Sequence, residues 1–333
     1  MKRNKIIVLG SLAFDYIMSF EENFVNAVSI DMEREEYQST ITANSRVQHF
    51  GGTAGNIAYN LGLLNISEVS LLGSVGKDFE TLGYKAHINR FQNIDLNVDI
   101  QTDLFTAACY IVNDKKSNQM IIFHGGALDE SKNIDLRKKI INPEEYAYAI
   151  NSTQSIEAMK NFANQLNDLQ IPMIFDPGQI TPLFSKEELL DILSKSEILI
   201  GNSFEISQVL NKTDLDEQNI LNFVKAIIKT KGPNGSELIL KSKSEELNHE
   251  EIPIAIPRTT VDATGAGDGY RAGILTGLIL KMNLLDACRF GSILGSFVVE
   301  TNGAQTQLYD IKIVKARFQK TYGYIPPELE MFS

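Results

Sequence analysis

The chain has 333 residues, of which 43% are hydrophobic, enough to bury the core of one large domain. Its 42 acidic and 31 basic residues give a formal net charge of −11, which argues against nucleic acid and anionic membrane surfaces as partners. The two cysteines, Cys109 and Cys288, show neither a metal-binding spacing nor a disulfide framework. We therefore expect a cytoplasmic protein.

The first apolar run, residues 6–11, is continuous, as in a strand at the middle of a parallel sheet. Basic residues before it imitate a signal peptide, but the run is short and Asp15 follows without a convincing cleavage site. Asp286 and Arg289 interrupt the most apolar region, so no window predicts a membrane span. Asp15 lies just past the carboxyl end of the predicted strand, where open α/β sheets bind ligands.

Residues 18–50 are polar and weakly patterned, which fits either a long surface excursion or a small lid over a site. Residues 106–112 and 119–124 are extended pieces separated by a polar turn, as in a hairpin. We assign both regions to one β-sheet lid, formed by about 16–48 and 98–124.

The sequence HFGGTAGN, residues 49–56, leads into a helical pattern that closes near Gly62. Gly51 and Gly52 allow a close approach of the backbone to a ligand, and Asn56 would project from the first helical turn. A plain structural turn is an equally good interpretation of this fragment. A strand at 69–75 and a helix from 78 to about 91 are predicted next.

From residue 146 onward, strand and helix patterns alternate. The predicted strands are 146–150, 173–176, 198–200 and 237–240, and the helices are 155–169, 185–193, one that ends near 210, and 220–228. This alternation predicts an α/β fold with a doubly wound, mostly parallel sheet and helices on both faces. Asn202 and Glu205 follow the third of these strands, where they can form a capping box or reach a metal through water.

The stretch 261–279 predicts a loop, a turn of small residues and a helix, so the turn lies at a helix N-terminus. Unpaired N–H groups and the helix dipole attract anions there. Asp268 in the first turn can be an ordinary helix-start acid. An acid inside an anion site is otherwise unfavourable, unless its function is to accept a proton. Two further helices are predicted at 284–299 and about 310–321.

The nucleotide signatures GxxxxGK[ST] and GxGxxG are both absent. The chain instead contains GGTAGN, NSFE, TKGPNG and DATGAGD in this order. This set resembles the ribokinase-like (PfkB) family of carbohydrate and nucleoside kinases over essentially the whole length, 1–333. The fold that the resemblance implies, a doubly wound α/β domain with a small β-sheet lid, agrees with the elements predicted above.

The resemblance also implies roles for the matching residues. Asp268 corresponds to the catalytic base, and the anion hole to Gly265, Ala266 and Gly267. The residues that match substrate-binding positions are Asp15, Gly51, Gly52 and Asn56. The residues that match ATP-binding positions are Asn202, Thr230, Gly232 and Gly235. Glu205 matches a residue that places Mg²⁺ through water, and the positions of a monovalent cation such as K⁺ match Asp262, Thr264 and Gly303. Ala263 departs from the family motif, which has a threonine, but it keeps a small residue there.

Arg271 is one turn beyond Asp268 on the same helix face, and we group it with the substrate-binding residues because it can touch phosphate. Its alternative interpretation is an ordinary exposed helix arginine.

The resemblance implies ATP and Mg²⁺ as cofactors, and three functions remain open. The first is transfer of the γ-phosphate to the 5′-hydroxyl of a nucleoside, with adenosine the leading acceptor. It is favoured by Thr53, where ribokinase-type loops carry lysine, and by DGYRAG at 268–273, which resembles microbial nucleoside kinases. The second is a sugar kinase acting on ribose, fructose or a related compound. The third is a non-catalytic nucleotide-binding protein, against which the intact Asp268 argues.

A nucleoside pocket needs apolar cover for the base, and the lid offers four aromatic candidates: Phe20, Phe105, Tyr110 and Phe123. Sequence alternation alone does not assign their faces. The oligomeric state is left open, and a homodimer through the lid is one arrangement compatible with the resemblance.

Overall fold

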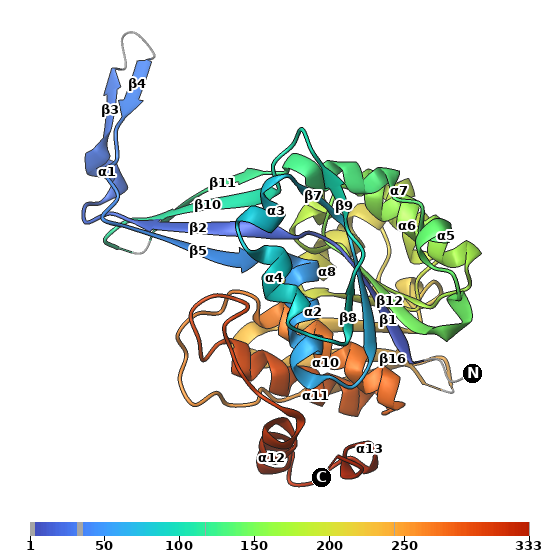
Figure 1. Ribbon diagram of the computed structural model, residues 1–333. Coiled ribbons are helices and arrows are strands. Elements are labelled where there is room, and N and C mark those ends of the chain that lie inside the picture. Colours follow the sequence, from blue (N-terminus) through green and yellow to red (C-terminus); the bar gives the residue numbers. More distant parts are fainter. Residues whose placement is uncertain (1–3, 32–35, 117, 243, 333) are drawn as a thin grey trace.

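A nine-stranded sheet forms the centre of the molecule, in a computed structural model that describes residues 4–31, 36–116, 118–242 and 244–332 (Figure 1). In sheet order its strands are β17 (Leu247–Ile252), β16 (Ser236–Lys241), β15 (Ala226–Thr230), β14 (Ile198–Asn202), β13 (Met173–Asp176), β12 (Tyr146–Ser152), β1 (Lys5–Leu9), β6 (Glu68–Leu72) and β8 (Ile94–Leu96). The strands from β15 to β8 are parallel to one another, whereas β16 is antiparallel to β15 and β17 is antiparallel to β16.

Both faces of this sheet are buried, because successive side chains of each strand enter opposite apolar layers. Ile6 and Val8 of β1 lie in one layer, and Ile7 and Leu9 lie in the other. The helices that supply the first layer include α2 (Thr53–Leu64), α10 (Ala266–Leu280), α11 (Leu284–Val298) and α12 (Ile311–Tyr322). Those that supply the second include α6 (Ile156–Asp168), α7 (Lys186–Leu193) and α8 (Ser203–Thr213). The predicted doubly wound α/β fold is confirmed.

A second, four-stranded sheet stands beside the central one, in the order β11-β10-β2-β5 (Figure 1). Its strands are β2 (Ala13–Ser19), β5 (Ser45–Gly51), β10 (Ala107–Asn113) and β11 (Gln119–His124). We call this sheet the lid sheet. The hairpin of β3 (Val28–Asp31) and β4 (Glu36–Ser39), preceded by α1 (Phe24–Ala27), projects from its far end (Figure 1).

Residues 32–35 and 117 of the lid predicted from the sequence lie outside the described residues. Residues 99–101 lie outside the lid sheet because β9 (Asp99–Gln101) pairs with β7 (Ser74–Gly76). The remaining elements are α3 (Asp78–Thr81), α4 (Tyr84–Asn89), η1 (Gly126–Asn133), α5 (Leu136–Lys139), η2 (Pro143–Glu145), η3 (Gly178–Leu183), α9 (Glu217–Ile220), η4 (Gly232–Asn234) and α13 (Pro327–Glu330).

The predicted helix over 220–228 is wrong. Of this range only Ile220, the last residue of α9, is helical. The chain then enters β15, whose residues pair with β14 on one side and β16 on the other. Buried Ile227 and Ile228 face opposite layers there, and β-branched side chains suit such a strand. The predicted helix from 78 to 91 is divided by Gly83, whose φ of 88° is left-handed.

No helix in the described ranges is long and apolar enough to cross a membrane.

Candidate active site

The backbone of the turn before α10 can approach neighbouring groups closely. Gly265 is the N-cap residue with a φ of 79°, and no side chain caps this helix start. A Cβ on Gly265 would lie 2.4 Å from the Cβ of Ala304, so the turn packs directly on the loop after α11. Helix-start N–H groups and the helix dipole at this position favour an anion. Gly265, Ala266 and Gly267 thus lie at this helix start, where the sequence predicts an anion hole.

Asp268 occupies the first turn of α10 and is partly exposed beside this anion turn. Its carboxylate accepts a hydrogen bond of 2.8 Å from the Nδ2 of Asn56 on α2. Burial raises the pKa of Asp268 to about 7, and the carboxylates of Asp176 and Asp15 add to that rise. Arg271 and Asn56 act against it. A carboxyl group with a pKa near neutrality is suited to accept a proton during a reaction.

Asp15 extends from β2, directly opposite His49 of β5. Gly51 is needed because a Cβ there would lie 2.2 Å from the Oδ2 of Asp15. Gly52 has a φ of 84°, and a Cβ on it would lie 2.5 Å from the carbonyl oxygen of Ser11. Burial, and then the Asp262 carboxylate, raise the pKa of Asp15 to about 6. Asp15, Gly51 and Gly52 therefore meet at the junction of the lid sheet and α2.

Arg271 is neither exposed nor free. Its Nε and Nη2 donate to the two carboxylate oxygens of Asp176, at 2.5 and 2.6 Å, and its Nη1 donates to the carbonyl of Gly267 at 3.0 Å. The side chain is 7% exposed. The alternative of an exposed helix arginine is therefore wrong, and the guanidinium links the anion turn to the end of β13. Contact with phosphate remains a prediction for this residue.

The residues predicted to bind ATP lie on neighbouring strand ends. Asn202 pairs with Thr230 across β14 and β15. Asn202 and Glu205 form a full capping box at the start of α8, with bonds of 2.9 and 2.7 Å. Gly232 and Gly235 have φ values of 57° and 85° in the turn after β15, and no atom lies within 4 Å of a Cβ on Gly232. The backbone is thus open at Gly232, whereas a Cβ on Gly235 would lie 2.2 Å from the carbonyl oxygen of Ile252.

The residues predicted to hold a monovalent cation also meet. The Asp262 carboxylate accepts hydrogen bonds from the backbone N–H groups of Thr264 at 2.9 Å and Gly303 at 3.0 Å. Both bonds lower the pKa of Asp262, against the effect of burial. Within the described ranges, no group of three or more His, Cys, Asp or Glu side chains could hold a metal ion. Backbone oxygens would therefore have to complete a cation site here.

Sequence reasoning missed Gln305, Tyr84 and His49, which the fold brings to the same place. The Nε2 of Gln305 lies 2.9 Å from the Oδ1 of Asn56 and 2.8 Å from the hydroxyl of Tyr84. The ring of His49 lies against Gly303, where a Cβ would be 2.6 Å from Nδ1. From the sequence, Gln305 could be assigned only to a turn after α11, and no sequence signal indicates a contact with α2.

The face of the lid sheet that carries Asp15 is apolar beyond His49, the residue directly opposite Asp15, as far as the polar residues at its far end. Residues directly opposite one another across a strand pair share a face, and the pairing from Asp15 and Ile17 extends to Val47, Cys109, Ile111, Ile121 and Phe123. Among the four proposed aromatic cover residues, only Phe123 lies on this face. Tyr110 pairs with Tyr16 and its ring stacks on that of Tyr16. Phe105 lines a separate cavity of about 480 Å³ together with these two residues. Phe20 packs on Phe24.

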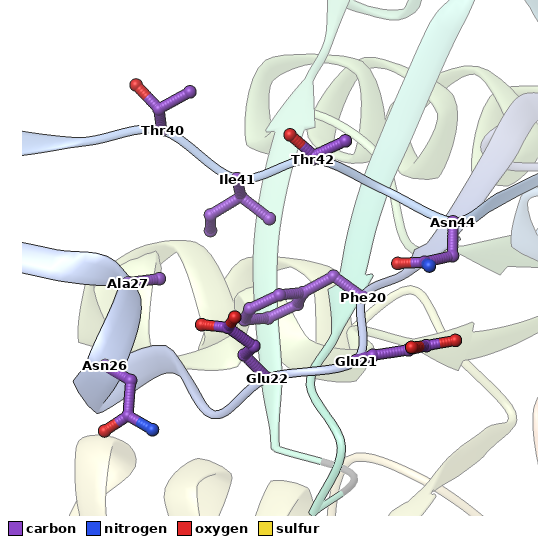
Figure 2. A pocket seen from close by; sticks show the side chains of 9 residues that line it. All are labelled: Phe20, Glu21, Glu22, Asn26, Ala27, Thr40, Ile41, Thr42 and Asn44. Carbon is purple, nitrogen blue, oxygen red and sulfur yellow. The ribbon is translucent and has the colours of Figure 1, made fainter.

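A further cavity, of about 620 Å³, lies at the base of the β3–β4 hairpin and is lined from two segments, 20–27 and 40–44 (Figure 2). Phe20, one of the four proposed cover residues, lines it, whereas the residues with predicted catalytic, substrate-binding, ATP-binding or metal-binding roles do not. The predicted catalytic base and anion turn lie elsewhere, at the start of α10.

Gly51→Ala is expected to raise the KM for the acceptor ~10-fold or more, because the added methyl group displaces the Asp15 carboxylate from its position. Steady-state kinetics with varied acceptor provide the measurement. Gly323→Ala is the control, because no atom lies within 4 Å of a Cβ there although φ is 81°, so backbone strain lowers stability alone. Equal KM values in the two variants would contradict the placement of Asp15.

The family model described as pfkB family carbohydrate kinase matches residues 13–311, so the chain belongs to this family and is a kinase. The nucleoside kinase of Methanocaldococcus jannaschii is 32% identical over 324 residues, covering 96% of this chain and 98% of the relative. The crystal structure of a nucleoside kinase from that organism superimposes with a TM-score of 0.84 at 30% identity, over 96% of this chain and 99% of the other. A nucleoside kinase from Burkholderia thailandensis in complex with inosine gives a TM-score of 0.79 at 27% identity, with the same coverage.

Proposed function

We propose that this kinase transfers the γ-phosphate of ATP to the 5′-hydroxyl of a nucleoside. The observation that carries the proposal is the apolar lid face beside Asp15, because a polar anchor next to apolar cover fits a molecule with ribose hydroxyls and a flat base. The likeness to nucleoside kinases over nearly the whole chain supports it. One of these relatives has also been solved in complex with ADP-inosine.

In this mechanism Asp15 holds the ribose hydroxyls, and the apolar lid face holds the base. The acceptor oxygen then lies between Asp268 and the anion turn. Asp268 accepts the proton of the attacking hydroxyl, and the helix-start N–H groups of α10 stabilise the charge on the transferred phosphoryl group. A base of this kind contributes about 100- to 10,000-fold to the rate.

In this proposal Glu205 would hold Mg²⁺ through a water molecule. The Oε2 of Glu205 accepts from the backbone N–H of Asn202, while Oε1 has no hydrogen bond within the described ranges and can bind a metal-held water. Burial raises the pKa of this carboxyl group, a penalty that a nearby cation would relieve. When bound, Mg²⁺ neutralises charge on the phosphates. The loop of Asp262, Thr264 and Gly303 is the proposed place for K⁺.

Adenosine, inosine and ribose compared side by side test the choice of acceptor. We expect kcat/KM to be far higher for at least one nucleoside than for ribose, with adenosine the leading acceptor. Asp15→Ala should lower activity towards nucleosides and ribose alike, whereas Phe123→Ala should lower it only for nucleosides. Efficient phosphorylation of ribose or fructose without activity on nucleosides would instead establish a sugar kinase.

Tyr110→Ala is the matched control for Phe123→Ala. Both residues are partly exposed aromatics on neighbouring strands, at 38% and 56%, but Tyr110 lies on the opposite face of the lid sheet. We expect Tyr110→Ala to keep the wild-type preference for nucleosides over ribose. Equal effects of the two substitutions would contradict the role given to the apolar face.

A further inference from the structure

A chain of buried side chains connects Asp268 to the backbone of the glycine pair. The Nδ2 of Asn56 donates to Asp268 at 2.8 Å, and the Nε2 of Gln305 lies 2.9 Å from the Oδ1 of Asn56. The same Nε2 lies 2.8 Å from the hydroxyl of Tyr84, which donates to the carbonyl of Gly51 at 2.6 Å. Asn56 and Gln305 are 5% and 3% exposed, and Tyr84 is fully buried.

The donor and the acceptor of each hydrogen bond in this series can be assigned by starting from the backbone carbonyl of Gly51. A carbonyl oxygen only accepts, so the hydroxyl hydrogen of Tyr84 must point at Gly51. The hydroxyl oxygen of Tyr84 then accepts, which requires the NH₂ group of Gln305 to face it. The second hydrogen of that NH₂ group points at Asn56, whose oxygen must therefore face Gln305. The NH₂ group of Asn56 is left to face Asp268.

We propose that Gln305 is a positioning residue of the phosphotransfer site, which fixes the Asn56 amide with its NH₂ group towards Asp268. This inference rests on the proposed function, in which Asp268 is the base. Gln305 touches neither base nor acceptor, and it acts through Asn56 alone. Without it, the amide of Asn56 can turn its oxygen to Asp268, and the carboxylate then loses its donor and faces a second acceptor.

The consequence is measurable as a change in the pH dependence of activity. The Asn56 hydrogen bond holds the pKa of Asp268 down, so its loss moves the acidic limb of the pH profile to higher pH. The other ionisable groups around Asp268 are Arg271 of α10, Asp176 at the end of β13, Asp15 of β2 and Tyr84 of α4. His87 lies beside Gln305, and burial lowers its pKa to about 4, so it stays neutral over the range of the assay.

Gln307, two residues further along the loop, supplies a control because it contacts Asn60, one turn of α2 beyond Asn56. Gln307 donates from Nε2 to the Oδ1 of Asn60 at 3.0 Å, as Gln305 does to Asn56, and its side chain is likewise buried, with 1% exposed. Asn60 in turn donates to the carbonyl of Asn56 rather than to Asp268. Gln305→Met and Gln307→Met therefore remove comparable hydrogen bonds from comparable surroundings, but only the first releases the Asn56 amide.

The experiment is the pH profile of kcat/KM for a nucleoside between pH 5 and pH 10, in the wild type and both variants. A hydrogen bond to a charged group shifts the pKa by about one to two units, so Gln305→Met should move the acidic limb up by that amount. Activity at pH 7 should fall ~10-fold and largely return at pH 9. Gln307→Met should keep the wild-type limb. An unshifted limb in Gln305→Met, or the same profile in both variants, would overturn the proposal.

A second variant guards against a folding defect. Gln305→Glu keeps the shape but only accepts hydrogen bonds, so it attracts the NH₂ group of Asn56 away from Asp268 and should shift the limb at least as far. If the wild type phosphorylates no nucleoside at any pH, the proposed function fails. The titration of Asp268, followed by carboxyl ¹³C NMR, then still tests the positioning. An unchanged pKa in both Gln305 variants would refute it.

Discussion

Asp268→Asn is expected to lower kcat/KM about 100- to 10,000-fold and yet to raise the thermal stability of the protein at neutral pH. The loss of activity follows from removal of the proton acceptor. The amide keeps the shape of the carboxylate and can still accept the hydrogen bond from Asn56. ATP binding should therefore remain near the wild-type level, as measured by calorimetry.

The gain in stability follows from the raised pKa of Asp268. Its value of about 7 in the folded protein lies above the ordinary 3.8, so the folded state binds the proton more tightly than the unfolded state. The wild type therefore loses stability as the pH rises from about 4 through 7, whereas the amide of the Asp268→Asn variant does not titrate. The difference in Tm between variant and wild type should be clear at pH 8 and nearly absent at pH 4.

Asp95→Asn is the control, because Asp95 is an exposed acid on β8 at the far edge of the central sheet. It should change neither activity nor the pH dependence of Tm. Near-normal turnover of a folded Asp268→Asn variant would remove Asp268 from the role of base.

Arg271→Met is expected to cost about 3–5 kcal/mol of stability, because it leaves the buried Asp176 carboxylate without its partner. The double variant Asp176→Leu with Arg271→Met should be clearly more stable than the sum of the single changes predicts, since it removes both charges. Urea unfolding of the four proteins measures this coupling. Activity should fall with either single change, because Arg271 also holds the carbonyl of Gly267 in the anion turn.

The pair of Arg137 and Asp168 is the matched control. Its atoms are 2.5 Å apart, but the two side chains are 59% and 53% exposed. Solvent screening limits such a pair to about 0–1 kcal/mol, so Arg137→Met should be almost neutral. A cost for Arg271→Met no larger than for Arg137→Met would contradict the structural importance of the buried pair.

The parts of the site that could be predicted from the sequence are those that depend on neighbours along the chain. The turn from Gly265 to Asp268 and the capping box of Asn202 and Glu205 each lie within one short segment, where small residues and caps have local signatures. The alternating elements were likewise sufficient for the doubly wound sheet.

Contacts across the fold could not be predicted in this way. Gln305 meets Asn56 across 249 positions and Arg271 meets Asp176 across 95, and neither pair leaves a pattern in one sequence. The faces of Tyr110 and Phe123 depend on strand register, since a shift by one residue would exchange them. The helix expected at 220–228 was wrong because tertiary pairing of β15 outweighed a local pattern.

Odd-numbered and even-numbered residues of these lid-sheet strands lie on opposite faces of the sheet. Positions 17, 47, 111, 121 and 123 share the face of Asp15, whereas Phe14 and Phe50 lie on the other face and pack with Tyr84 in the core. In the proposed binding mode, substitutions at these odd-numbered positions alter the fit of an acceptor without loosening that packing or reaching Asp268. A lineage with this lid can change its acceptor by point mutation while the phosphate-transfer chemistry stays under unchanged selection.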